Sequence, residues 1–160
     1  MGNINSCWTA ETAETSSSCV MKTATTAHNF TVPNYSLLKG MGVGKFVSST
    51  TFSAGGHKWK IRFYPDGNKA TGHAAAFLCL CSGAPAAGVH TKFTLSLLVN
   101  DGKVHADSKA SSSCITHTFE AKADNAWGFT DFIEMSKLHQ NCFTIRCDLT
   151  VIKKPSKMQA

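Results

Sequence analysis

Long hydrophobic runs are scarce in this sequence. The longest apolar stretch lies around Ala74–Cys81 and has the length of a strand, far short of the roughly 20 residues that a membrane helix needs. Residues 1–19 contain no Lys or Arg and no hydrophobic core segment, so we expect no secretory signal. These absences predict a protein that does not bind membranes and that lies in the cytoplasm, the nucleus or both.

Motifs that carry catalysis are also absent. The sequence has no HExxH or GxSxG motif and no pair of carboxylates next to a histidine. The glycine-rich segment Gly40–Lys45 lacks the spacing of a phosphate-binding loop, and it precedes a strand-like stretch instead of a helix. We therefore predict that the protein is not an enzyme and uses no cofactor.

The cysteines do not follow a metal-binding pattern. There are seven, at positions 7, 19, 79, 81, 114, 142 and 147, and an odd number without a secretory signal predicts free thiols in a reducing compartment. Neither the spacing of Cys79 and Cys81 nor that of Cys142 and Cys147 is the close CxxC pair that zinc sites use. No metal is expected.

The net charge of +6 raises the question of nucleic-acid binding. Most lysines stand singly along the chain, and only Lys58, Lys60 and Arg62 and the C-terminal lysines are clustered. A nucleic-acid site needs a basic stripe on one face. We therefore expect no nucleic-acid partner, and a protein of that class would show steep salt dependence of binding.

Short stretches of β-branched and aromatic residues, separated by Gly, Pro, Asn and Asp, predict an all-β chain. The alternation of polar and apolar residues is regular in Lys58–Phe63 and again from Phe143 onward. The expected strands are His28–Val32, Lys45–Phe52, Lys58–Tyr64, Ala75–Ser82, Thr91–Val99, Lys103–Asp107, Ile115–Ala121 and Phe143–Ile152.

Eight short strands without a long crossover helix favour an antiparallel two-sheet sandwich. One short helical turn is expected within Thr130–Leu138. The predicted organisation is a Ser/Thr-rich flexible lead-in at 1–23, one domain at 24–153 and a basic tail at 154–160.

The segment Ala126-Trp127-Gly128-Phe129 has two large aromatic residues around a glycine, and we place it in a loop after the Ile115–Ala121 strand. Two interpretations stay open on the residues alone. The rings can belong to the core of the sandwich, with the glycine turning the chain. Alternatively, they can form the walls of a peptide groove beside a sheet.

Several motifs occur in the order and approximate spacing of a MATH domain, and together they cover about residues 28–152. They are Asn29-Phe30 with Tyr35-Ser36, Lys39-Gly40-x-Gly42, Ser48-Ser49-Thr50-x-Phe52, Trp59-x-Ile61-x-Phe63-Tyr64-Pro65-x-Gly67 and Trp127-Gly128-Phe129-x-x-Phe132. The chain resembles the MATH half of plant MATH-BTB proteins. The resemblance implies a TRAF-like β-sandwich, which agrees with the fold class expected from the strand pattern.

The resemblance also implies a function. Similar MATH domains are substrate receptors for cullin-RING ubiquitin ligases and bind extended, Ser/Thr-rich degrons that begin with a nonpolar and a polar residue, by strand addition. The implied partners are proteins with such degrons, and BTB-bearing MATH proteins with a cullin behind them. The groove residues implied are Phe77, Phe93, His117, Phe119, Asn125, Trp127, Gly128 and Phe129, with Phe77 and Phe93 as an aromatic floor.

The sequence departs from this pattern at some positions. His117 stands where the family has a tyrosine, and Asn125-Ala126 replaces a charged Lys-Asp pair. We expect a groove of similar shape with altered preference. The chain is either a domain excised from a longer protein or a solitary MATH protein, and a solitary one would compete for substrates without delivering them. An alternative without any peptide ligand is a structural module that self-associates through the same strand edge.

Overall fold

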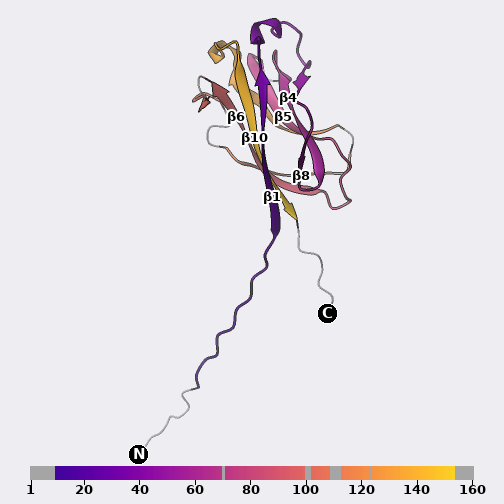
Figure 1. Ribbon diagram of the computed structural model, residues 1–160, viewed down its shortest axis with the longest axis vertical. Coiled ribbons are helices and arrows are strands. Elements are labelled where there is room, and N and C mark those ends of the chain that lie inside the picture. The colour runs from indigo at the N-terminus through magenta and orange to yellow at the C-terminus, as the bar shows by residue number, and fades with distance from the viewer. Residues whose placement is uncertain (1–9, 70, 100–101, 109–112, 123, 154–160) are drawn as a thin grey trace, which may run out of the picture.

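The computed structural model describes residues 10–69, 71–99, 102–108, 113–122 and 124–153. Over these residues the chain forms two antiparallel sheets that pack face to face (Figure 1). This confirms the predicted β-sandwich. Cys7 and the predicted tail at 154–160 lie outside the described residues.

The first sheet, which we call sheet A, has the order β1-β10-β6, with β7 and β8 pairing with opposite ends of β6. Its strands are β1 (Lys22–Val32), β10 (Phe143–Lys153), β6 (Val89–Val99), β7 (Lys103–Val104) and β8 (Ile115–Phe119). β1 pairs along its whole length with β10, from Lys22 opposite Lys153 to Val32 opposite Phe143. β1 and β8 therefore lie at opposite edges of sheet A.

The second sheet, sheet B, has the order β4-β5-β9, with β2 and β3 both pairing with β4. Its strands are β2 (Val47–Ser48), β3 (Phe52–Ala54), β4 (His57–Tyr64), β5 (His73–Leu80) and β9 (Asn125–Glu134). In the described part of the chain, β9 pairs only with β5 and β8 only with β6. The two strands lie at the same side of the sandwich, because a short turn connects them.

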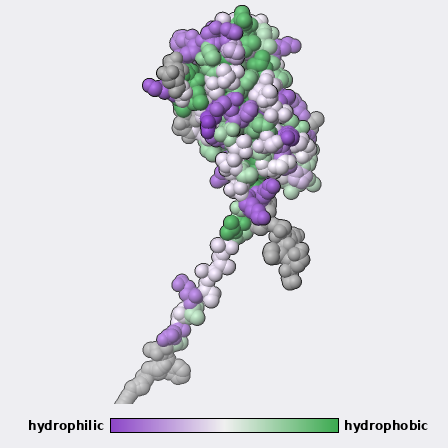
Figure 2. All heavy atoms as spheres, in the orientation of Figure 1, coloured by the Kyte–Doolittle hydropathy of each residue, from purple (hydrophilic) through white to green (hydrophobic). Residues whose placement is uncertain are grey.

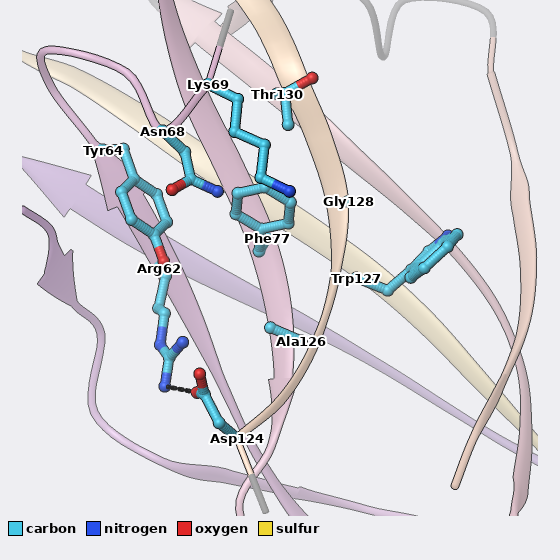
Figure 3. Close-up of a pocket in the computed structure, with 10 residues that line it drawn as sticks. All are labelled: Arg62, Tyr64, Asn68, Lys69, Phe77, Asp124, Ala126, Trp127, Gly128 and Thr130. Atoms are coloured by element: carbon cyan, nitrogen blue, oxygen red, sulfur yellow. Dashed lines mark ion pairs between the residues drawn. The ribbon is translucent and has the colours of Figure 1, made fainter. Parts of the chain in front are cut away.

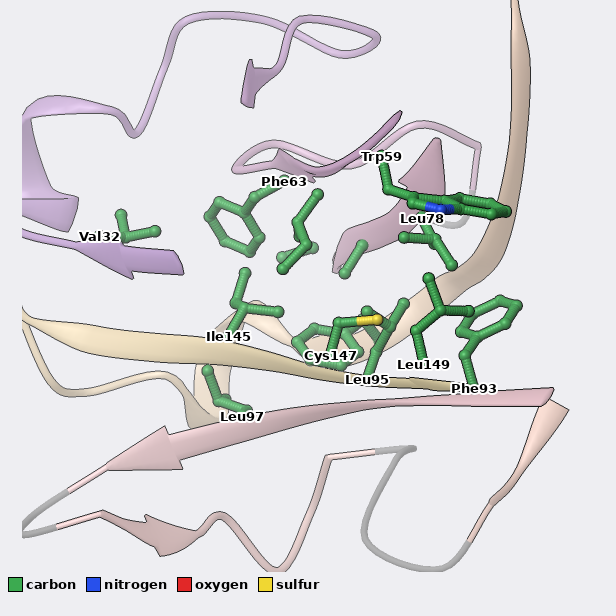
Figure 4. Close-up of a cluster of buried hydrophobic side chains, with 14 of the residues drawn as sticks. Val32, Trp59, Phe63, Leu78, Phe93, Leu95, Leu97, Ile145, Cys147 and Leu149 are labelled. Carbon is green, nitrogen blue, oxygen red and sulfur yellow. The ribbon is translucent and has the colours of Figure 1, made fainter. Parts of the chain in front are cut away.

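The core lies between the sheets and follows the period of two that strands impose. Trp59, Ile61 and Phe63 of β4 face Phe93, Leu95 and Leu97 of β6, and all six are at most 1% exposed. Figure 4 shows Trp59 and Phe63 on one side of this core and the side chains of β6 and β10 on the other, pointing toward one another; those labelled are Phe93, Leu95, Leu97, Ile145, Cys147 and Leu149. The Trp59 indole is satisfied in this interior because its Nε1 donates to the Ala54 carbonyl at 3.0 Å.

The prediction of a loop at Ala126-Trp127-Gly128-Phe129 is wrong, because these residues lie inside β9. The helical turn predicted within Thr130–Leu138 is the single 3₁₀ turn Met135–Lys137, and a second 3₁₀ turn, which was not predicted, covers Tyr35–Leu37. A register shift between β5 and β9 explains why the strand at residues 126–129 was not recognised. Ala74 pairs with Ile133, whereas Ala76 pairs with Phe129, so β9 contains extra residues opposite Ala75.

The glycine-rich segment at residues 40–44 has a structural role. The Asp66 carboxylate accepts hydrogen bonds from the backbone N–H groups of Gly40 and Gly42, at 3.0 and 2.6 Å. The Gly44 N–H donates to the Gly67 carbonyl at 2.9 Å. The segment is thus fastened to the turn after β4 by charge-assisted hydrogen bonds.

Candidate functional site

The side of the sandwich where β8 and β9 lie next to each other carries a group of aromatic side chains. His117 of β8 and Trp127 of β9 stack with their ring centroids 4.2 Å apart and their planes within 7° of parallel. Trp127 is 49% exposed, the largest exposed aromatic surface among the described residues. Phe129, two residues further along β9, is partly buried against the core and stacks on Phe132 at 6.5 Å.

The β-strand register explains why these rings meet. In β8, Phe119 pairs with the buried Val89 and His117 pairs with the buried Thr91, so both residues face the other sheet. In β9, Trp127 pairs with Leu78 of the core, which gives Trp127 the same inward direction. At the edge of a sandwich an inward side chain meets the opposite sheet's edge strand. His117 and Trp127 therefore bridge the two sheets where no further described strand covers them.

The stack is the outer end of a continuous row of rings. His117 contacts Phe119 edge-on at 4.7 Å, and Phe119 contacts Trp59 edge-on at 5.1 Å. Phe119 also lies 6.2 Å from Phe93. Edge-to-face pairs at these distances are favourable beyond the area they bury. The exposed Trp127 is thus supported by a rigid aromatic layer that reaches the centre of the core.

Desolvation changes the acid–base behaviour of His117. Burial, with a further contribution from the charge of Lys122, holds the pKa of His117 below its ordinary value of 6.5. The ring is therefore neutral at physiological pH. A neutral imidazole presents an aromatic face and one donor and one acceptor nitrogen.

A second feature lies on the outer face of sheet B, directly behind β9. A cleft of about 370 Å³ is lined by Arg62 and Tyr64 of β4, Phe77 of β5, Gly128 and Thr130 of β9, and by Asn68, Lys69, Asp124, Ala126 and Trp127. Figure 3 shows Phe77 and Trp127 on opposite sides of the β9 ribbon, with Lys69 extending over Phe77. β9 thus separates an aromatic side from a mixed polar side.

An ion pair closes one end of this cleft. Arg62 Nη2 lies 2.8 Å from Asp124 Oδ1, and Arg62 is largely buried whereas Asp124 is 74% exposed. The guanidinium also lies over the Phe46 ring, 4.5 Å from its centroid. Sequence reasoning missed Arg62, Asp124 and Tyr64. The alternation of β4 predicts that Arg62 and Tyr64 point away from the core, but the pairing of β4 with β5 and β9 was needed to place them beside Phe77.

Gly128 is required by the contact between β5 and β9. A Cβ built at this position would lie 2.3 Å from the Ala76 carbonyl oxygen and 2.8 Å from Phe77 Cα. In the structure the space is taken by the neighbouring strand and by the Phe77 ring, whose Cδ1 would lie 3.1 Å away.

The structure places the predicted groove residues in three groups. His117, Trp127 and Phe129 lie together at the aromatic edge, and Phe77 and Gly128 lie together on the outer face of sheet B. Phe93, Phe119 and Asn125 are buried, at 1%, 0% and 4% exposed, so they support the edge from beneath. Phe77 and Phe93 belong to different sheets and form no common floor. Asn125 instead donates from Nδ2 to the Glu120 carbonyl and holds the β8–β9 turn.

Comparison with known proteins identifies the fold. The sequence matches the MATH domain family over residues 27–150. The chain belongs to the MATH domain family. MATH domains are protein-interaction modules, and this MATH domain is therefore one as well.

Curated relatives of this MATH domain are longer proteins. BTB/POZ and MATH domain-containing protein 4 of Arabidopsis thaliana is 34% identical over 151 residues, which cover 86% of this chain and 32% of the relative. BTB/POZ and MATH domain-containing protein 5 of the same plant is 33% identical over 151 residues, covering 86% and 36%. TNF receptor-associated factor homolog 1a is 31% identical over 112 residues, covering 64% and 10%. The chain spans about a third of the length of the first two relatives.

Among the described residues, no group of three or more His, Cys, Asp or Glu side chains is arranged to hold a metal ion. None of the helices in the described ranges is long and apolar enough to cross a membrane.

Proposed function

We propose that this MATH domain binds extended, Ser/Thr-rich segments of other proteins along the side formed by β8 and β9, and that it acts as a substrate receptor, or a competitor of one, for a cullin-RING ubiquitin ligase. The observation that carries the proposal is the half-exposed Trp127, stacked on His117 at an edge where β8 and β9 have no further described strand partner. The ligase class is what the resemblance to plant MATH-BTB proteins implies, and the similarity to BTB/POZ and MATH domain-containing proteins supports that resemblance.

Strand addition explains how such a site can combine affinity with choice. An extended peptide beside β9 would form backbone hydrogen bonds that do not depend on its sequence. Its side chains would point alternately to the two sides of the strand. One set would meet the rings of Trp127 and Phe129, and the other would meet Thr130 and Lys69 at the cleft. A nonpolar residue followed by a polar one suits this alternation.

The charge of the site supports polar ligands. Because the pKa of His117 is lowered, the aromatic edge carries no positive charge of its own at neutral pH. Ser and Thr side chains are short, neutral and able to donate and accept hydrogen bonds. They can occupy both the neutral edge and the cleft without leaving a buried charge unpaired.

The proposal is tested by peptide binding to the full chain. A fluorescein-labelled array of Ser/Thr-rich peptides that begin with a nonpolar and a polar residue should yield ligands with Kd near the micromolar level, about −8 kcal/mol. Trp127→Ala should cost about 2 kcal/mol of binding free energy, roughly thirtyfold in Kd, if Trp127 is a hot spot. Far-UV circular dichroism verifies that the variant is folded.

Leu37→Ala is the matched control, because Leu37 is an exposed hydrophobic residue in the 3₁₀ turn after β1, on no strand of the proposed site. It should leave the peptide Kd unchanged. A folded Trp127→Ala protein that binds its peptide like the parent would remove this site from the function. The alternative of self-association without a peptide ligand predicts a mass that rises with concentration and that no peptide of the array reduces.

A further inference from the structure

The lead-in segment, residues 10–21, is an extended piece of chain outside the sandwich. Every one of its residues is exposed and none is in a helix or strand before β1 begins at Lys22. Figures 1 and 2 show it extending away from the body of the protein. Its central sequence, Ala13-Glu14-Thr15-Ser16-Ser17-Ser18, starts with a nonpolar and a polar residue and continues with hydroxyl side chains. This is the class of segment that the proposed site accepts.

The charges of the lead-in segment and of the sandwich are complementary. All 16 Lys and Arg residues lie at Lys22 or beyond, whereas residues 1–21 contain only Glu11 and Glu14 as charged groups. The remaining 8 of the 10 acidic residues leave the rest of the chain at +8, against −2 for residues 1–21. Opposite net charges favour encounter between the lead-in of one molecule and the sandwich of another.

The attraction has a local counterpart at the site. Lys69 lies at the cleft behind β9 with its side chain exposed, and Lys122 follows β8 in the turn to β9. If residues 13–18 lie beside β9, adjacent side chains point to opposite sides of that strand. Ala13 can then face the rings of Trp127 and Phe129 while Glu14 faces the side of Lys69. A neutral residue meets the aromatic edge and the acidic one meets the ammonium group.

The topology favours a second molecule as the acceptor. The lead-in segment joins β1, and β1 lies at the edge of sheet A opposite to β8. In the structure the segment runs away from its own sandwich (Figure 1). One edge carries a fully exposed extended segment, and the opposite side carries an aromatic edge without a further strand partner among the described residues. Together they can form a head-to-tail contact between two molecules.

We infer that the lead-in segment of one molecule adds as a strand along β9 of a second molecule and occupies the same site that is proposed for partner peptides. The inference rests on the proposed function, because it uses the same edge. It has a functional consequence: self-association and partner binding exclude each other. A partner with higher affinity would displace the lead-in segment, and a weak one would be kept out.

The experiment compares the full chain with two variants by sedimentation equilibrium over a range of concentrations. Ser16→Pro/Ser17→Pro removes two backbone donors from the lead-in segment, which strand addition needs. Trp127→Ala damages the acceptor edge. The parent should associate, and each variant alone should associate at least tenfold more weakly. The matched control, Ser16→Thr/Ser17→Thr, keeps both backbone donors and should associate like the parent.

Mixing the two variants gives the decisive measurement. The proline variant has an intact acceptor edge and the Trp127→Ala variant has an intact lead-in segment, so an equimolar mixture should form a 1:1 complex that neither variant forms alone. A synthetic peptide of residues 10–21 should dissociate the complex, and raised salt should weaken it. No 1:1 complex in the mixture would overturn the inference.

The outcome is separable from that of the proposed function. A parent that stays monomeric at concentrations where a labelled Ser/Thr-rich array peptide saturates it would overturn the inference and leave the proposed function intact. Association that persists in both variants would overturn it as well, because the contact would then lie elsewhere. Association lost in both variants and restored in their mixture would support it, whichever array peptide binds.

Discussion

Substituting Gly128 by alanine tests the packing of β9 against β5 most directly. The added Cβ would lie 2.3 Å from the Ala76 carbonyl oxygen and 2.8 Å from Phe77 Cα, and both are backbone atoms. A backbone clash cannot be relieved by rotating a side chain, so β5 and β9 must separate. Overpacking of this kind typically costs about 1–3 kcal/mol. We expect about 3 kcal/mol here, because backbone atoms already fill the space that the methyl group would need.

The expected loss is large relative to the whole. Native domains are stable by about 5–15 kcal/mol, so about 3 kcal/mol removes a fifth or more of the folding free energy. For a domain of about 150 residues this corresponds to a fall in Tm of roughly 6–12 °C. The same movement would shift Trp127 and Phe129 at the site, so the affinity for a Ser/Thr-rich peptide should fall as well.

The assay is urea unfolding followed by far-UV circular dichroism, with differential scanning calorimetry as a second measure. Gly83→Ala is the matched control, because a Cβ at Gly83 would meet nothing within 4 Å. It should be neutral or stabilise by a few tenths of a kcal/mol, since alanine restricts the unfolded chain. A Gly128→Ala protein as stable as the Gly83→Ala protein would refute the close approach of β5 and β9.

Three further predictions concern thiols, pH and the glycine-rich segment. Cys79 and Cys147 should resist iodoacetamide in the native protein and react in urea, as measured by peptide mass spectrometry. The reason is that burial raises the pKa of Cys79 to about 12 and also raises the pKa of Cys147. Labelling of either thiol in the native protein would contradict the packing. Stability should fall as the pH is lowered from about 7 to about 5, because the pKa of His117 is lowered in the folded state and the unfolded chain then binds more protons. His117→Gln should flatten part of this slope in urea titrations, and an unchanged slope would speak against the buried stack. Asp66→Ala should cost about 2 kcal/mol of unfolding free energy, because it leaves the N–H groups of Gly40 and Gly42 without their acceptor. Asp66→Asn should cost less. Equal losses of unfolding free energy in the two variants would show that the charge of Asp66 matters more than the geometry of its hydrogen bonds.

Strands with regular alternation could be predicted from the sequence. β4 and β10 show alternating buried and more exposed positions, and their predicted limits differ from the observed ones by a single residue at one end. Alternation also groups Phe93 with Leu95 and Leu97, and this pattern agrees with the burial of Phe93. The resemblance to MATH domains suggested the opposite placement for this residue.

β9 could not be predicted in the same way. Gly128 in the middle of the segment is typical of a turn. The extra residues opposite Ala75 shift the phase of the alternation, so that Phe129, Phe132 and Ile133 stand at a spacing typical of a helix. Only the pairing with β5 shows that the segment is a strand.

The cleft depended on still more distant information. Arg62 and Asp124 are far apart in the sequence, and their ion pair exists because β4, β5 and β9 are neighbours in sheet B. No local motif marks such a pair. The cysteines, in contrast, needed no topology, because the described ones are free, as their odd number in the sequence suggested.

The tight fit at Gly128 has a consequence for how MATH domains of this type can diverge. Because the position admits no side chain, a change of binding preference has to come from the residues that surround it. His117 and Trp127 can vary on one side of the strand, and Lys69 and Thr130 on the other, without disturbing the seam between β5 and β9. Gly128 therefore has to stay constant, while the side chains on the two sides of β9 can change independently of each other.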